Sequence, residues 1–144
     1  MRLRGTKRIV YALALSATVV AIGCGGDDDD VNNNADNYEG TEAEVAQVID
    51  DLGNAGRDGD GTKICEDIFT ADLVKSIERG AGQSCESEVD DNLEQDEYEL
   101  EIDSLEVDGD SATVGTTDQK DRSALLRLQR IDGAWRVVSF SPSP

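Results

Sequence analysis

The spacing of the apolar residues changes near Gln95, and this change constrains the fold more than any other feature of the 144-residue chain. Before Gln95 the apolar residues recur every three or four positions, as on one face of an α-helix. After it they alternate with polar residues, as in strands that are buried on one side. Helices followed by strands predict a single α+β domain, with N-terminal helices packed on a curved antiparallel sheet of about four strands.

The helical part divides into several segments. Thr41 and Glu44 have the spacing of a capping box, which predicts that a helix begins there, and the glycine-rich residues 53–56 predict its end. Further apolar residues at helical spacing predict two short pieces divided near Thr70, then a helix that begins behind Ser84. These three later segments cover residues 64–69, 73–77 and 85–93.

The strand part contains two turns and one irregularity. Acidic and apolar residues alternate from Tyr98 to Asp103, after which the alternation changes phase, so a β-bulge is expected near Asp103. The sequences Asp-Gly-Asp at 108–110 and Asp-Gly at 132–133 favour hairpin turns. Alternate apolar positions predict four strands around these features, at residues 98–107, 112–116, 124–128 and 135–140.

The first 24 residues have the organisation of a bacterial export signal. Four basic residues precede an almost entirely apolar stretch from Ile9 to Ile22, which is shorter than the roughly 20 residues that span a bilayer. The stretch ends in Gly23-Cys24 and resembles the lipobox of bacterial lipoproteins, with Ala21 where leucine is commoner. The resemblance implies cleavage after residue 23 and a diacylated Cys24. Two acyl chains are enough for stable anchoring, so we expect a lipid-anchored protein on the extracytoplasmic face of the cell membrane.

The alternative interpretation of Cys24 is an incidental cysteine in an ordinary signal peptide or in an uncleaved anchor. Under the lipoprotein interpretation, residues 1–23 are the signal peptide. Residues 24–40 contain four consecutive aspartates and almost nothing apolar, which predicts a lipidated cysteine followed by a disordered acidic tether. The single folded domain is then expected over residues 41–144.

Cys65 and Cys85 remain when Cys24 is assigned to the lipid. An even number of cysteines in an exported domain predicts a disulfide bond, here one that joins two helices. A redox or zinc-binding pair is the alternative. That alternative lacks support, because the two residues do not form a Cys-x-x-Cys motif and the chain contains no histidine.

The chain is strongly acidic, with 13 basic and 32 acidic residues. Four of the basic residues lie in the leader, so the processed chain keeps nine against 32 and carries a net charge of −23. Such a surface repels nucleic acid and anionic headgroups, while cation binding, a saline habitat and simple solubility all remain open. The Asp-Gly-Asp sequences at 58–60 and 108–110 lack the ligand pattern of an EF-hand loop. We therefore predict no metal or other cofactor.

The order of elements resembles the nuclear-transport-factor-2-like superfamily, also called the SnoaL-like or cystatin-like cone fold. The resemblance covers residues 41–141. It rests on the opening amphipathic helix, the Gly-Asp-rich turn after it, the Asp-Gly-Asp-Ser-Ala sequence at 108–112 and the closing segment from Arg130 to Val137. The family implies an isomerase or cyclase pocket, a ligand-binding cup or an association surface. Its members often form a homodimer through the outer face of the sheet.

Enzymatic members of this family combine a buried aspartate base with a histidine or tyrosine partner, and this chain has no histidine. We therefore expect a non-catalytic module that binds a small apolar ligand or a protein partner. A SnoaL-like or ketosteroid-isomerase-like enzyme that uses a buried carboxylate is the alternative. The apolar residues expected to line the cavity, or to fill it, are Tyr98, Leu126, Leu128 and Trp135.

Overall fold

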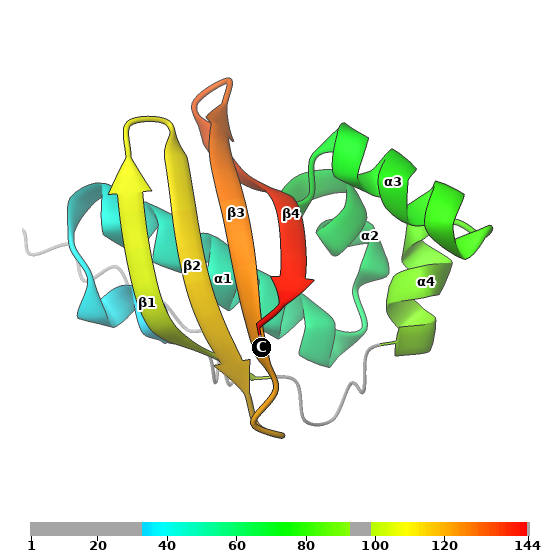
Figure 1. Ribbon diagram of the computed structural model, residues 1–144, viewed down its shortest axis with the longest axis horizontal. Coiled ribbons are helices and arrows are strands. Elements are labelled where there is room, and N and C mark those ends of the chain that lie inside the picture. Colours follow the sequence, from blue (N-terminus) through cyan, green and yellow to red (C-terminus); the bar gives the residue numbers. More distant parts are fainter. Residues whose placement is uncertain (1–32, 93–98, 144) are drawn as a thin grey trace, which may run out of the picture.

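The computed structural model describes residues 33–92 and 99–143, which form a helical layer and a four-stranded sheet (Figure 1). The predicted signal peptide, Cys24 and Tyr98 lie outside the described residues. The helices are η1 (Asn34–Asn37, 3-10), α1 (Gly40–Asp58), α2 (Gly61–Lys63), the π-helix η2 (Ile64–Ile68), α3 (Ala71–Ala81) and α4 (Cys85–Asn92). The strands are β1 (Leu100–Asp108), β2 (Ser111–Asp118), β3 (Ser123–Ile131) and β4 (Ala134–Pro142). The α+β prediction is confirmed.

The four strands form an antiparallel meander in the order β1-β2-β3-β4. The register of β1 shifts between Ile102 and Ser104, which confirms the predicted bulge. Asp132 and Gly133 both have positive φ, 52° and 85°, as a two-residue type I′ hairpin turn requires. Both predicted hairpin turns are therefore present, at Asp132-Gly133 and between β1 and β2.

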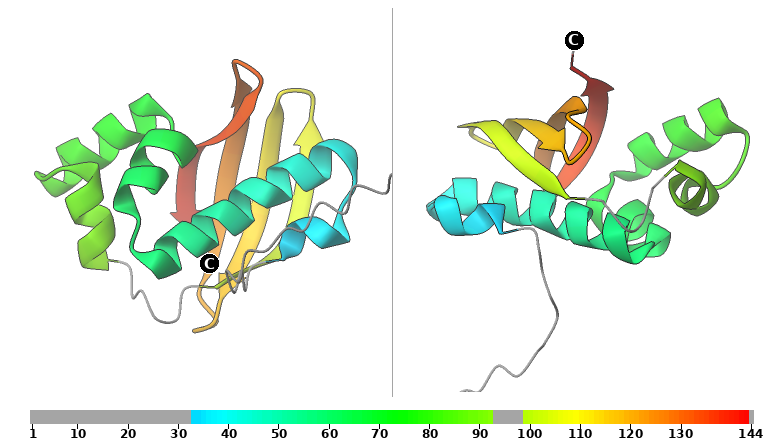
Figure 2. Two further views of the ribbon diagram at one scale, coloured as in Figure 1. Left: turned by 180° about the vertical axis from the view of Figure 1, so that it is seen from behind. Right: turned by 90° about the horizontal axis from the view of Figure 1, so that it is seen from below.

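The helices cover one face of the sheet and continue beyond its β4 edge. Helix α1 crosses the sheet, whereas α3 and α4 lie past β4 (Figures 1 and 2). The β4 edge is joined to the helical part at Val137, whose carbonyl accepts a hydrogen bond of 3.0 Å from the Thr70 backbone N–H. The core between the layers is apolar, and its fully buried side chains include Val45, Ile49, Ile64, Val114, Leu128 and Val137.

Helix α1 is longer than the sequence predicts. It begins at Gly40, and Glu39 at its N-cap makes no side-chain capping bond, so the predicted capping box is absent. Glu44 instead reaches the sheet, where Arg130 and the Trp135 indole donate to its carboxylate. The expected stop at 53–56 is also wrong, because Gly53 and Gly56 are buried inside the helix, which ends at Asp58 and is followed by Gly59 with a φ of 68°.

The N-terminal segment is docked earlier than the predicted boundary at residue 41. Asn34 and Ala35 lie against the buried Asp50 of α1, whose carboxylate accepts hydrogen bonds from both backbone N–H groups at 2.9 Å. The Asn34 side chain also donates to the Leu100 carbonyl at 2.7 Å and accepts from the Ile102 N–H at 3.0 Å. The described domain thus begins at η1, so residues 34–37 are ordered and the expected tether is shorter at this end.

The later helices follow the predicted division. Thr70 caps α3 by accepting a hydrogen bond from the Leu73 N–H, and Ser84 accepts one from the Ser87 N–H at the start of α4. Cys65 in η2 and Cys85 in α4 form a disulfide with a Cα–Cα distance of 6.1 Å. The predicted cross-link between two helices is therefore confirmed, and it encloses the whole of α3.

Candidate functional site

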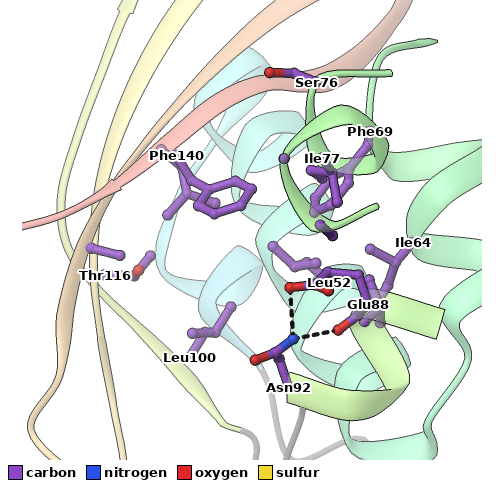
Figure 3. Close-up of a pocket in the computed structure, with 15 residues that line it drawn as sticks. Leu52, Ile64, Phe69, Ser76, Ile77, Glu88, Asn92, Leu100, Thr116 and Phe140 are labelled. Atoms are coloured by element: carbon purple, nitrogen blue, oxygen red, sulfur yellow. Dashed lines mark hydrogen bonds between the residues drawn. The ribbon is translucent and has the colours of Figure 1, made fainter. Parts of the chain in front are cut away.

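An apolar pocket of about 600 Å³ lies between the sheet and the later helices (Figure 3). Only four of its fifteen lining residues in the described part of the chain carry polar side chains: Ser76, Glu88, Asn92 and Thr116. The remaining lining residues are apolar or glycine, and they come from the helices, from Phe69 and from strands β1, β3 and β4. The volume and the apolar lining are typical of sites for small molecules, which commonly measure about 300 to 1,000 Å³.

The sheet supplies one wall of the pocket, and a bulge in β4 determines its composition. Arg127 pairs with Ser139 but the next residue, Leu128, pairs with Val137, so Val138 is an extra residue in β4. The bulge changes the alternation of side chains, and Phe140 consequently lines the pocket together with Leu126. The Phe140 ring stacks on Phe69 with a centroid distance of 6.0 Å, yet Phe140 remains 52% exposed. Phe140 therefore marks the solvent-facing rim.

Thr116 is the polar group in the wall formed by the sheet. It lies on β2 beside Ala124 of β3, with which it is paired, and it is 1% exposed. Its hydroxyl has no hydrogen-bond partner among the described residues. A buried hydroxyl without a partner is unfavourable by about 1 to 3 kcal/mol, so a hydrogen bond from a molecule in the pocket would relieve this cost.

Helix α3 forms part of the opposite wall and is held loosely by the rest of the domain. It contains no fully buried residue, although Leu73, Val74 and Ile77 pack partly against the core. Gly80 and Ala81 line the pocket from the same helix, and a Cβ atom added at Gly80 would meet no atom within 4 Å. The small residues leave the space under the C-terminal turn of α3 open.

Glu88 and Asn92 of α4 form the polar side of the pocket, across from Thr116 (Figure 3). The Asn92 amide donates to the Glu88 carboxylate at 2.9 Å and to the Glu88 carbonyl at 2.8 Å. The second carboxylate oxygen of Glu88 accepts from Gln83 at 2.9 Å. Both oxygens of this carboxylate thus accept hydrogen bonds from neutral amides, one on α4 and one just before it.

Comparison with solved structures identifies the fold. An NTF-2-like protein of unknown function from Silicibacter pomeroyi DSS-3 superposes with a TM-score of 0.52 and 18% sequence identity, over 70% of this chain and 94% of that chain. This chain has the nuclear-transport-factor-2-like fold. A second NTF-2-like protein of unknown function, from Shewanella baltica OS155, gives a TM-score of 0.49 and 19% identity over 70% and 92% of the two chains. No protein-family model and no curated protein matches the sequence.

The predicted cavity residues divide between the pocket and the core of this nuclear-transport-factor-2-like domain. Leu126 lines the pocket as predicted, whereas Tyr98 lies outside the described residues. Leu128 and Trp135 are buried in the core and are not among the described residues that line this pocket. Trp135 contacts α1 instead, where its indole donates to Glu44 at 3.3 Å, and Arg130 stacks over its ring at 5.1 Å.

Sequence reasoning missed the buried acid of the helical layer. Asp50 is 2% exposed, and it lies on the same helical face as Ala46 and Gly53, four residues before and three after it. That spacing places Asp50 on the buried face of the helix, and it is the sequence signal by which the residue could have been found. Asp50 does not line the pocket, and its two oxygens bind Asn34 and Ala35.

Two further properties bear on what the described residues can bind. Within residues 33–92 and 99–143, none of the helices has the length and apolar character of a membrane span. The described part of the chain also contains no group of three or more Asp, Glu, Cys or His side chains placed to bind a metal ion.

Proposed function

We propose that this protein is a lipid-anchored, extracytoplasmic module that binds a small apolar ligand without transforming it. The observation that carries the binding part of the proposal is the pocket of about 600 Å³, whose lining is apolar except for four residues. Binding of an apolar ligand to a cavity of this size is favourable, because the ligand displaces water from the apolar walls. A ligand could enter at the rim of the pocket, where Phe140 is partly exposed to solvent.

The anchoring part of the proposal rests on the lipobox resemblance at Gly23-Cys24. A chain attached through Cys24 reaches the docked residue Asn34 after ten residues. A flexible segment of that length has an end-to-end distance of about 16 to 19 Å. The domain would therefore lie close to the membrane surface, at a distance at which ligands that partition into the bilayer are concentrated.

Binding is favoured over catalysis by the positions of the carboxylates. Of the two acids that an enzymatic alternative could use, Asp50 is buried but does not line the pocket. Glu88 lines the pocket, but its oxygens accept hydrogen bonds from Asn92 of α4 and from Gln83, which precedes this helix. A general base must lie within about 3 Å of the proton that it removes, and neither carboxylate is presented unpaired to the pocket interior.

The anchor is tested with Cys24→Ser. We expect this variant to appear in the soluble fraction or as an uncut precursor, whereas the wild-type protein fractionates with membranes. The melting temperature of the domain should not change, because the proposed tether separates residue 24 from the helices and the sheet. Incorporation of a fatty-acid analogue that persists in Cys24→Ser would contradict the lipid attachment.

The pocket is tested with a matched pair of variants at Gly80. Both Gly80→Ala and Gly80→Leu raise helix propensity by about 0.8 to 1 kcal/mol, and neither meets a neighbouring atom at Cβ. Only the leucine side chain is long enough to occupy part of the pocket that Gly80 lines. We expect both variants to be at least as stable as the wild type, and only Gly80→Leu to lose binding of the hydrocarbon probe diphenylhexatriene. Equal binding by all three proteins would show that the pocket is not the site.

A further inference from the structure

We propose that the ligand is an uncharged molecule with an apolar body and one hydrogen-bonding group, an alcohol or a ketone, that meets the hydroxyl of Thr116. This inference rests on the proposed ligand-binding function and adds the chemical class of the ligand. Three features of the described residues carry it: the unpaired hydroxyl, the apolar surfaces around it and the single charged residue in the lining.

The hydroxyl of Thr116 is not explained by the fold. Two residues earlier on the same face of β2, the core uses Val114, which has the same shape without a hydroxyl and is also fully buried. The next residue, Thr117, is on the other face, and its hydroxyl donates to Asp103 at 2.6 Å. Of these three neighbouring β-branched residues, only Thr116 has a buried polar atom with no partner in the described structure.

The surroundings of Thr116 favour a single polar group on the ligand. Across the sheet its neighbours are Ile102 of β1 and Ala124 of β3, and Leu100 and Leu126 line the adjacent pocket wall. A ligand that carried several polar groups near this wall would leave all but one of them unpaired against apolar side chains, which is unfavourable. One hydroxyl or carbonyl oxygen satisfies the site.

The charge of the lining favours a neutral ligand. Glu88 is the only charged residue among the described residues that line the pocket. An anionic ligand would bring its charge either beside this carboxylate or into the apolar interior, and both placements are unfavourable. The nearest arginine of α3, Arg79, does not line the pocket, and its guanidinium donates to the Lys75 carbonyl at 3.0 Å. It is therefore not placed to pair with a buried anion.

The test uses two competitors with the same chain, decanol and decanoate, which displace diphenylhexatriene from the full-length protein. Binding that is lost in Gly80→Leu defines the signal from the pocket. We expect decanol to compete at least about tenfold better than decanoate, because a charge buried beside a carboxylate is penalised. In Glu88→Gln, which keeps the shape and one acceptor, we expect the affinity for decanoate to rise and that for decanol to stay unchanged.

The role of Thr116 is tested with Thr116→Val, which removes the hydroxyl and preserves the shape. We expect decanol to bind about three- to tenfold more weakly, the range given by one net hydrogen bond, while binding of the hydrocarbon probe is retained. Folding should not suffer, because the variant removes an unpaired buried hydroxyl. Thr117→Val is the matched control, since its hydroxyl lies outside the pocket, and it should leave decanol binding unchanged.

The outcomes separate this inference from the proposed function. If diphenylhexatriene shows no signal that depends on Gly80, ligand binding in the pocket is refuted, and the inference with it. If the probe binds but Thr116→Val leaves decanol affinity unchanged, the hydrogen bond to Thr116 is refuted and the apolar pocket stands. If decanoate competes as well as decanol, the restriction to uncharged ligands is refuted.

Discussion

Removal of the disulfide between Cys65 and Cys85 is the perturbation with the most calculable consequence. The bond joins residues 20 positions apart and encloses α3, which has no fully buried residue of its own. Both cysteines are themselves buried, at 6% and 0% exposure. Reduction therefore releases a loop whose native contacts are few, and most of the effect should come from the greater freedom of the unfolded chain.

The magnitude follows from the entropy of closing that loop. For about 20 residues the chain-entropy model gives a loss near 11 cal/mol/K in the unfolded state, or about 3.3 kcal/mol of stability at 25 °C. A domain of about 100 residues changes its melting temperature by about 4 °C for each kcal/mol. We expect the melting temperature to fall by about 13 °C on reduction.

The assay is thermal and urea unfolding of three samples: the oxidised protein, the reduced protein and the double variant Cys65→Ala/Cys85→Ala. The reduced protein keeps both sulfur atoms in the core, whereas the variant does not. Equal losses in these two samples assign the effect to the cross-link, and an additional loss in the variant measures the packing of the buried sulfurs. The m-value should also increase when the bond is absent, because the unfolded chain then exposes more surface.

Two results would refute this reasoning. A melting temperature that changes by less than about 3 °C would show that the enclosed loop is already restricted in the unfolded state. A full loss of stability with an unchanged m-value would place the effect in the native state instead, most simply in the packing of α3. Hydrogen exchange in residues 71–81 distinguishes these cases, because only the second predicts faster exchange in the folded protein.

Two further predictions concern carboxylates that accept several hydrogen bonds. Asp50→Ala removes the acceptor for Asn34 and Ala35 and should lower the free energy of unfolding by about 3 kcal/mol in urea unfolding. Asp51→Ala is the control, because its carboxylate accepts an exposed hydrogen bond from Gln47, and it should lower that free energy by less than about 0.5 kcal/mol. Equal losses would contradict the docking of η1. Burial by itself raises the pKa of Asp118, but hydrogen bonds from Arg122 and Lys120 outweigh it and hold the pKa below its ordinary value. A lowered pKa in the folded state gives stability that is present above the unfolded pKa of about 3.9 and is lost as the pH falls through the lower folded value. The wild type should therefore lose more stability than Asp118→Asn between pH 5 and pH 2. Parallel curves of stability against pH for the two proteins would contradict this role of Asp118.

Much of the fold could be predicted because local sequence signals and tertiary structure agree. Four strands, the bulge after Ile102, the turn at Asp132-Gly133 and the division at Thr70 all depend on the period of the pattern or on residues with special backbone conformations. Each of these signals acts over a few residues. Tertiary contacts have little opportunity to override them.

The errors in the helical part have the opposite cause. Gly53 and Gly56 resemble a helix stop, but both are buried within α1, so the packing of this helix in the domain overrides their low helix propensity. Glu44 has the position of a capping residue, yet its carboxylate binds Arg130 and Trp135, which are more than 80 residues away in the chain. A pattern confined to one segment contains no information about these distant partners.

A local sequence pattern also cannot distinguish pocket residues from core residues within one strand. Leu126 and Leu128 are two residues apart on the same face of β3, about 7 Å along the strand, and they are indistinguishable in an alternating pattern. Leu128 pairs with Val137, in the part of the sheet next to Trp135 and α1, and is fully buried. Leu126 pairs with Phe140, beyond the β4 bulge, and lines the pocket. Which leucine is buried in the core and which lines the pocket is decided by where α1 covers the sheet and where β4 bulges. For this reason a pocket-lining residue of this domain could be assigned to the correct face of the sheet from sequence, but it could not be distinguished from a core residue on that face.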